Sequence, residues 1–520
     1  MMKMTQSLKI AATTTPNMLA TVFGEREQTW SQLETRVARL AGALRGLGVN
    51  CSDRVAILAN NSDRYLEYYF SVWWAGAAVM PLNVRWSPSE NAYSLNDGGA
   101  KILFVDDHFS ADVEEICRTT NHDLTLIYIG EGECPSGMLR YEDLIAEANA
   151  IGEAEVGSDD LAGIFYTGGT TGFPKGAMLS HQCIWFNGIM SSKHYYFEPG
   201  DRYLHAAPMF HLADGSGSNG ASMAGATHCF LPSFTVEGVI AAIEKTKPTH
   251  VLLVPTMVGM ILESPGFESS QLSSLKHIIY GASPMPEGVL RQTMAALPDV
   301  KILQGYGQTE LGPIISTLPP QYHVLEGPYA GKLRSAGRPC VGVQVKILGE
   351  DGTEMPQGKV GEIAVKGPHT MLGYWKNPEQ TEATLKDGWV MTGDGAYLDE
   401  DGFIFIVDRV KDMIVTGGEN VFSAEVENVI STHPAVAAVA VVGIPNEKWG
   451  EAVHAIVIPR LGTQPTEVEI IDYCRTRIAN YKRPHSIDFR SEPFPLSGAG
   501  KVMKRELRAP FWAEQKLADG

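Results

Sequence analysis

Residues 166–176 read Y-T-G-G-T-T-G-F-P-K-G and place four glycines, three threonines and one lysine in eleven positions. The apolar run 161–165 before them predicts a strand that ends where the glycines begin. Glycines can turn several backbone N–H groups toward one anion, and threonine and lysine side chains add donors. A Walker A loop is excluded, because Lys175 follows Pro174 and Gly176 replaces the required Ser or Thr. Both a phosphate-binding loop and an inert Gly/Thr-rich surface loop fit this composition.

Five further short motifs follow along the chain. They are Y-G-A-S-P at 280–284, Q-G-Y-G-Q-T-E at 304–310, W-V-M-T-G-D at 389–394, D-R-V-K-D-M-I at 408–414 and P-L-S-G-A-G-K at 495–501. Together with the glycine-rich loop, these strings resemble in content and order the motifs of the adenylate-forming superfamily. That superfamily comprises acyl- and aryl-CoA synthetases, firefly luciferase and peptide-synthetase adenylation domains. The resemblance extends over nearly the whole chain.

The resemblance implies a binding site for ATP and Mg²⁺. Residues implied to bind ATP or AMP are Thr167, Gly168, Gly169, Thr170, Thr171, Gly172, Lys175, Gly281, Ala282, Ser283, Gln304, Gly305, Tyr306, Gly307, Thr309, Asp394, Arg409 and Lys501. Tyr306 would stack on adenine, and the acceptor-only carboxylate of Asp394 would bind the ribose diol beside Arg409. The implied catalytic residues are Lys501, Thr170, Glu310 and Lys175, with Thr170 and Glu310 as ligands of Mg²⁺.

An acyl pocket is implied around A-P-M-F-H at 207–211. Its expected residues are Phe210, His211, Gly215, Tyr280 and Gly281, with a structural core histidine as the alternative for His211. The next stretch, 213–227, is poor in bulky side chains, and glycine in a helix costs stability relative to alanine. Either a neighbouring element packs very closely there or space is left for a substrate. We expect space for an apolar acyl or aryl group.

The resemblance also assigns roles near the C-terminus. Lys411 would act as the hinge of a domain rotation, and Gly417, Gly418 and Glu419 would lie near CoA. Two residues depart from the family pattern. Gly168 stands where the phosphate loop usually has serine, so one hydroxyl donor is missing, and Ser423 stands where proline is frequent.

Strand and helix patterns alternate through most of the chain. Residues 29–47 predict a capped amphipathic helix that starts near Ser31, and apolar runs at 53–59, 101–105, 249–254 and 276–280 predict buried strands. This alternation is typical of parallel sheets covered by helices. The predicted fold is α/β: a large N-terminal domain (1–408) of such sheets with a small β-rich subdomain, then a small mobile α+β domain (409–520) that carries Lys501.

Composition narrows the function. A net charge of −18 excludes nucleic acid as a partner, since nucleic-acid binders present basic surfaces. The seven cysteines are dispersed and lack metal-site spacing, which predicts free thiols in a reducing cytoplasm. No run approaches the roughly 18 apolar residues that a membrane helix needs, so no transmembrane segment is expected.

The sequence therefore predicts an ATP-dependent, AMP-forming acyl-CoA synthetase that uses ATP, Mg²⁺ and CoA. It would convert a carboxylic acid to acyl-AMP and pyrophosphate and then transfer the acyl group to CoA. A medium- or long-chain fatty acid is the expected substrate, with an aryl or cinnamate-type acid as the alternative. A carrier-protein thiol, or oxygen as in luciferase, stays open as the acceptor, and a homodimer stays open as the assembly. The alternative from another class is a non-catalytic nucleotide-binding regulator.

Overall fold

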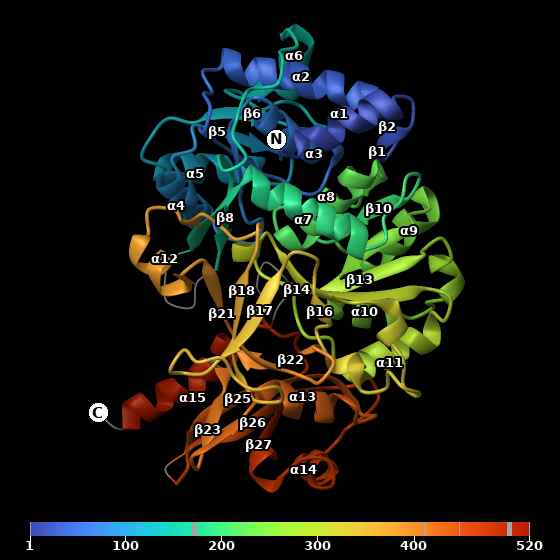
Figure 1. Ribbon diagram of the computed structural model, residues 1–520, viewed down its shortest axis with the longest axis vertical. Helices are drawn as coiled ribbons and strands as arrows, with labels where there is room; N and C mark the ends of the chain where they lie inside the picture. Colours follow the sequence, from blue (N-terminus) through green and yellow to red (C-terminus); the bar gives the residue numbers. More distant parts are fainter. Residues whose placement is uncertain (1, 169–173, 410–411, 447, 497–501, 519–520) are drawn as a thin grey trace.

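The computed structural model describes residues 2–168, 174–409, 412–446, 448–496 and 502–518. Within these residues the chain forms four β-sheets with helices packed against them, and the last sheet lies at one end of the molecule (Figure 1). None of the helices described is both long enough and apolar enough to cross a membrane.

The eight-stranded sheet carries the strands that flank the glycine-rich loop. In spatial order its strands are β19 (Gly373–Tyr374), β9 (Lys175–Ser180), β8 (Leu161–Thr167), β4 (Ala78–Pro81), β3 (Arg54–Leu58), β5 (Ile102–Val105), β6 (Thr125–Tyr128) and β7 (Leu139–Arg140). The strands from β8 to β7 are parallel, and β9 and β19 extend the sheet in antiparallel fashion.

Helices cover both faces of this sheet. They are α1 (Thr5–Thr14), α2 (Trp30–Gly46), α3 (Asp63–Trp74), α4 (Pro88–Gly98), α5 (Val113–Thr119) and α6 (Tyr141–Glu147). Val55 and Ile57 of β3 pack in the core that contains α2 and α3, whereas Ala56 packs with α4 and α5 on the other face. Successive residues thus point to opposite faces and both are buried, as expected for a covered parallel sheet. Helix α2 starts at Trp30, one residue before the predicted Ser31, and its capping box is formed by Thr29 and Gln32.

The nine-stranded sheet holds two of the other motifs. Its strands in spatial order are β16 (Arg338–Pro339), β15 (Ile314–Leu318), β14 (Lys301–Gly307), β13 (His277–Gly281), β12 (His250–Leu253), β10 (Arg202–His205), β11 (Thr227–Phe230), β1 (Leu19–Phe23) and β2 (Arg26–Thr29). The helices of this region are α7 (His181–His194), α8 (Leu212–Ala224), α9 (Val236–Thr246), α10 (Pro255–Leu262) and α11 (Glu287–Ala296).

The remaining two sheets are smaller. The β-rich sheet contains β17 (Gln344–Leu348), β18 (Gly361–Lys366), β20 (Leu385–Lys386), β21 (Trp389–Leu398) and β22 (Ile404–Arg409), with α12 (Pro378–Thr384) beside it. The C-terminal sheet contains β23 (Ile414–Thr416), β24 (Glu419–Val421), β25 (Val436–Asn446), β26 (Gly450–Pro459) and β27 (Ser486–Phe489), with α13 (Ser423–Ser431), α14 (Glu467–Arg475) and α15 (Lys504–Ala518). The predicted fold class is confirmed. The domain boundary at residue 408 stays a prediction.

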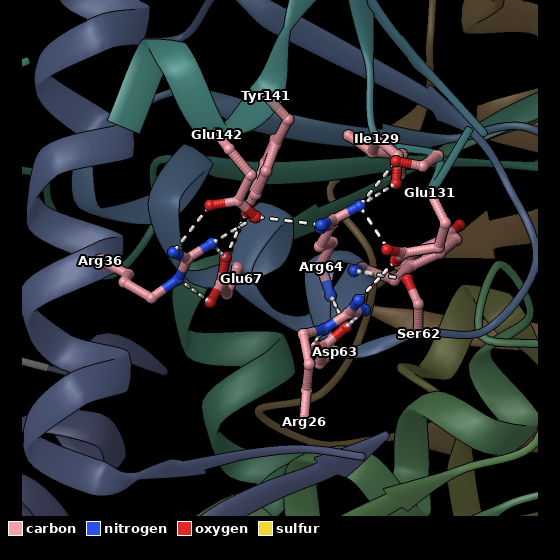
Figure 2. Close-up of polar contacts among 12 residues, drawn as sticks. Arg26, Arg36, Ser62, Asp63, Arg64, Glu67, Ile129, Glu131, Tyr141 and Glu142 are labelled. Carbon is pink, nitrogen blue, oxygen red and sulfur yellow. Dashed lines mark hydrogen bonds and ion pairs between the residues drawn. The ribbon is translucent and has the colours of Figure 1, made fainter. Parts of the chain in front are cut away.

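An ionic network around the buried side chains of Glu67 and Arg64 fastens helix α3 to its neighbours (Figure 2). Glu67 of α3 is fully buried and binds Arg36 of α2 through both carboxylate oxygens, at 2.6 and 3.1 Å. Arg64 of the same helix joins Glu142 and Glu131, both at 3.1 Å. Buried charges are tolerated only when they are paired in this way. The network therefore fixes the position of α3, whose other side faces α8.

Candidate active site

The glycine-rich loop joins the antiparallel strands β8 and β9. Thr167 at the end of β8 pairs with Lys175 at the start of β9, so Lys175 stands at the edge of the loop. The strand predicted at 161–165 is present and continues to Thr167. A Cβ at Gly168 would meet no described atom within 4 Å. Four predicted loop residues lie outside the described residues: Gly169, Thr170, Thr171 and Gly172.

Lys175 and Glu310 both contact Tyr374, one at the ring face and the other at the hydroxyl. Lys175 Nζ donates to Gln380 Oε1 at 2.6 Å and lies 5.7 Å from the centroid of the Tyr374 ring. The Tyr374 hydroxyl donates to Glu310 Oε1 at 2.7 Å. Burial, and next the Glu310 carboxylate, raise the pKa of Tyr374, so its hydroxyl remains a donor at neutral pH. Sequence reasoning missed both Tyr374 and Gln380.

Glu310 has the chemistry of a Mg²⁺ ligand. It lies in the short helix η3 (Thr309–Leu311) directly after β14, and its carboxylate accepts a hydrogen bond from a neutral phenol. Among the described residues Lys175 forms no ion pair with Glu310, and its ammonium donates to Gln380 Oε1. No cluster of three or more His, Cys, Asp or Glu suited to a metal occurs in the described ranges. One carboxylate with water and phosphate oxygens nevertheless suits Mg²⁺, which keeps much of its hydration.

A second cluster joins β14, β21 and β22. The Tyr306 hydroxyl donates to Asp394 Oδ2 at 2.7 Å, and Arg409 Nε lies 3.2 Å from Asp394 Oδ1. Asp394 and Arg409 are directly opposite each other in the register of β21 and β22. Burial, and next the Asp394 carboxylate, raise the pKa of Tyr306 well above its usual range. The structure thus brings together three predicted nucleotide-binding residues that come from separate motifs.

The end of β14 connects these two clusters, and β13 lies beside it. The strands pair in parallel with Gly281 opposite Gly305, so the motifs at 280–284 and 304–310 are neighbours. A Cβ on Gly281 would collide with the carbonyl oxygen of Gly305, which explains why glycine is needed there. Ala282 has a φ of +64°, an uncommon conformation for alanine. The other predicted nucleotide-binding residues of these two motifs are Ser283, Gln304, Gly307 and Thr309.

The predicted acyl-pocket residues belong to two elements. Phe210 and His211 directly precede α8, where His211 caps the helix by accepting a hydrogen bond from Ala213 N at 3.1 Å. Gly215 lines a cavity of about 20 Å³ enclosed by α3, α7, α8 and β8, which is room for about one water. Tyr280 and Gly281 lie on β13, and the Tyr280 ring packs in a separate core cluster beside α11. These assignments stay predictions.

The small residues of α8 serve close packing at two positions. A Cβ on Gly217 would collide with the Tyr203 ring of β10. A Cβ on Gly220 would lie 2.8 Å from Ser191 Cβ of α7. The expectation that this run leaves space for the substrate is therefore wrong at Gly217 and Gly220. There the alternative holds, because the missing side chains let β10 and α7 approach the helix.

Near the C-terminus, Gly417 and Gly418 form the turn between β23 and β24. Their φ angles are +59° and +84°, a conformation that favours glycine, and a Cβ on Gly417 would lie 3.3 Å from the Trp449 ring. Glu419 begins β24 and is exposed. The predicted hinge Lys411 and the predicted catalytic Lys501 lie outside the described residues.

Ser423 connects the chain before the predicted hinge to the chain after Lys501. Its hydroxyl donates to Asp408 Oδ2 and accepts from Lys504 Nζ, both at 2.5 Å. Its backbone N–H donates to the same Asp408 oxygen at 2.6 Å. Lys504 also forms an ion pair with Glu427 at 2.7 Å. A proline at this position could make none of the three Ser423 bonds.

A family model described as AMP-binding enzyme matches residues 8–375, and a second, described as AMP-binding enzyme C-terminal domain, matches residues 425–501. The chain belongs to the AMP-binding enzyme family. It is 37% identical to a feruloyl-CoA synthase of an Amycolatopsis species, over 95% of this chain and 96% of the relative. It is 34% identical to a fatty acid–[acyl-carrier-protein] ligase of Streptomyces coeruleorubidus, over 96% and 94% of the two chains.

A solved structure of another enzyme has a similar fold. The anthranilate CoA ligase AuaEII in complex with anthranoyl-AMP superposes with a TM-score of 0.90 at 26% identity, over 98% of this chain and 97% of that chain. The prediction of an AMP-forming acid–thiol ligase that uses ATP, Mg²⁺ and CoA is confirmed, in preference to a non-catalytic regulator.

Proposed function

We propose that this AMP-binding enzyme joins an aryl carboxylic acid to CoA through an acyl-AMP intermediate. The observation that carries the proposal is the placement of two polar clusters at the end of β14. The Asp394 cluster offers acceptors and a cation for a nucleoside, and the Glu310 cluster offers a carboxylate and an ammonium for phosphates. ATP presents both kinds of group in one molecule.

In the first half-reaction the substrate carboxylate is already ionised and attacks the α-phosphorus, so no general base is needed. A P–O bond forms to the acid, the bond to pyrophosphate breaks, and catalysis consists of positioning and charge neutralisation. Lys175 would hold the outer phosphates, and Lys501 would bridge the acid and the α-phosphate. When bound by Glu310 and Thr170, Mg²⁺ would supply positive charge against the phosphate oxygens.

In the second half-reaction the CoA thiol attacks the acyl carbonyl. A C–S bond forms, the C–O bond to AMP breaks, AMP leaves with the electron pair, and the thiol proton passes to water. Rotation about Lys411 would withdraw Lys501 and bring the turn at Gly417 and Gly418 to the site, with Glu419 beside CoA. We further propose that the enzyme forms a homodimer and resides in the cytoplasm, where its free thiols stay reduced.

Two observations support an aryl acid over a fatty acid. The relative at 37% identity is named for feruloyl-CoA, and the structural neighbour with a TM-score of 0.90 is named for anthranilate.

The acceptor and the acid can be tested in one assay. Pyrophosphate release is measured with ATP and Mg²⁺ across matched aryl acids and fatty acids, with CoA, with a loaded carrier protein, or with neither. We expect release that depends on an aryl acid and a thioester with CoA. Release only with fatty acids would overturn the substrate class, and thioester formation only on the carrier protein would overturn the acceptor.

A further inference from the structure

The segment 374–380 contacts both charged residues of the phosphate side of the site. Tyr374 is 7% exposed, and its hydroxyl and ring face contact Glu310 and Lys175 respectively. Gln380 supplies the amide oxygen that holds the Lys175 ammonium. We propose that Tyr374 and Gln380 are positioning residues that keep Glu310 ready for Mg²⁺ and Lys175 ready for phosphate. The proposal rests on the function proposed above.

The backbone holds Tyr374 at this place. Strand β19 pairs with β9 so that Tyr374 is opposite Ala177, which shares a face of β9 with Lys175 two residues earlier. Residues in such diagonal positions are within reach of an aromatic side chain. On the other side, Met371 N donates to the carbonyl oxygen of Glu310 at 2.9 Å. The segment is therefore tied to the strand of Lys175 and to the turn of Glu310.

Tyr374 contacts two side chains of opposite charge, Lys175 at its ring face and Glu310 at its hydroxyl. A direct ion pair between Lys175 and Glu310 would neutralise both groups before ATP and the metal arrived. The ring attracts the ammonium to its face, while the hydroxyl donates to the carboxylate and orients it. Outer hydrogen-bond partners of this kind orient metal ligands and tune their affinity.

Gln380 holds the ammonium without cancelling its charge. Its position is fixed at the start of α12, where its N–H donates to Asn377 Oδ1 at 3.0 Å and its amide nitrogen to Thr384 Oγ1 at 3.1 Å. A neutral amide oxygen is a weaker acceptor than an anion, because charge-assisted hydrogen bonds are roughly twice as strong. A phosphate can therefore displace Gln380 from Lys175, whereas a carboxylate at this position would compete with it.

Measurements of ATP binding and metal binding in the absence of the acid substrate distinguish the role of Tyr374 from that of Gln380. ATP affinity is measured by calorimetry with and without Mg²⁺, and metal affinity of the enzyme–ATP complex by titration with Mn²⁺ followed by electron paramagnetic resonance. Tyr374→Phe keeps the ring and should weaken metal affinity about 10-fold, as loss of an outer partner typically does. Gln380→Glu should weaken ATP binding about 10-fold and leave the metal affinity of the ATP complex within about twofold, because Lys175 becomes paired.

Tyr128→Phe provides a matched control, since Tyr128, the last residue of β6 at the far side of the eight-stranded sheet, also donates to a carboxylate, that of Asp107. Its metal and ATP affinities should equal those of the wild type. Unchanged metal affinity in Tyr374→Phe, or ATP binding unchanged in Gln380→Glu, would overturn the corresponding role. A wild-type chain that binds no ATP would instead overturn the proposed function, which keeps the two failures distinguishable.

Discussion

Replacing Ser423 with alanine removes a fully buried hydroxyl that bridges Asp408 and Lys504. Two hydrogen bonds to charged groups are lost, and each such bond contributes about 1.5–3 kcal/mol. Asp408 keeps the N–H of residue 423 and Lys504 keeps Glu427, at 2.6 and 2.7 Å. We therefore expect the lower end of the range for each bond, a total loss of about 3 kcal/mol in the free energy of unfolding.

The two half-reactions should respond differently to this change. Asp408 lies three residues before the proposed hinge Lys411, and Lys504 lies three residues after Lys501. Loosening their connection should shift the balance between the two orientations of the C-terminal domain, so the rates of acyl-AMP formation and thioester formation should change by different factors. Ser423→Pro fits the first turn of α13, where proline is tolerated, and should lose still more stability because the N–H is lost too.

Urea unfolding and the two separate half-reaction rates provide the assay. Ser431→Ala in the same helix is the control, because it removes one neutral hydrogen bond to the Asn428 carbonyl, worth about 1 kcal/mol. A stability loss in Ser423→Ala no larger than in this control would refute the energetic reasoning. Equal factors for both half-reactions would refute the link to domain movement.

Three further predictions concern the loop, the two lysines and a buried histidine. Lys501→Ala should abolish acyl-AMP formation yet spare thioester formation from supplied acyl-AMP, and Lys411→Pro should do the reverse; equal losses in both steps, measured separately, would contradict these roles. A serine side chain fits the open position of Gly168, so Gly168→Ser should restore a hydroxyl donor and tighten ATP binding about threefold in calorimetry. Weaker ATP binding in this variant would contradict the role of the hydroxyl. Burial lowers the pKa of His369 from 6.5 to about 4, so the unfolded state binds more protons between these values and stability falls as the pH drops from 6.5 to 4. Urea unfolding at pH 7 and at pH 4 measures this fall in the free energy of unfolding. His369→Phe should make the fall about 3 kcal/mol smaller, and a fall as large as in the wild type would contradict the assignment of the shifted pKa to His369.

Much of the fold could be predicted because local patterns and global packing agree. The run at 101–105 predicts the buried strand that is observed as Ile102–Val105, since a doubly covered strand is apolar at every position. The capping residue of α2 was not identified, because residues 29/32 and 31/34 both fit a capping pattern and only the folded chain shows that Thr29 caps the helix.

The motifs predicted the candidate site residues but not the contacts that depend on tertiary pairing. Their motifs predict Tyr306, Asp394 and Arg409 as nucleotide-binding residues, and the structure places the three in contact, while their roles stay predictions. Tyr374 contacts Lys175 only because β19 pairs with β9, about two hundred residues earlier in the chain. The packing of Gly217 against Tyr203 likewise depends on how α8 lies over β10. Local periodicity carries no information on either contact.

The most direct test of the account is a single-turnover experiment followed by mass spectrometry. The enzyme is mixed with ATP, Mg²⁺ and the aryl acid that gives most pyrophosphate, first without CoA and then with CoA added. We predict that the acyl-AMP accumulates on the enzyme and is converted to the CoA thioester, with release of AMP, when CoA is added. Release of ADP, or a thioester formed without a preceding acyl-AMP, would contradict the account.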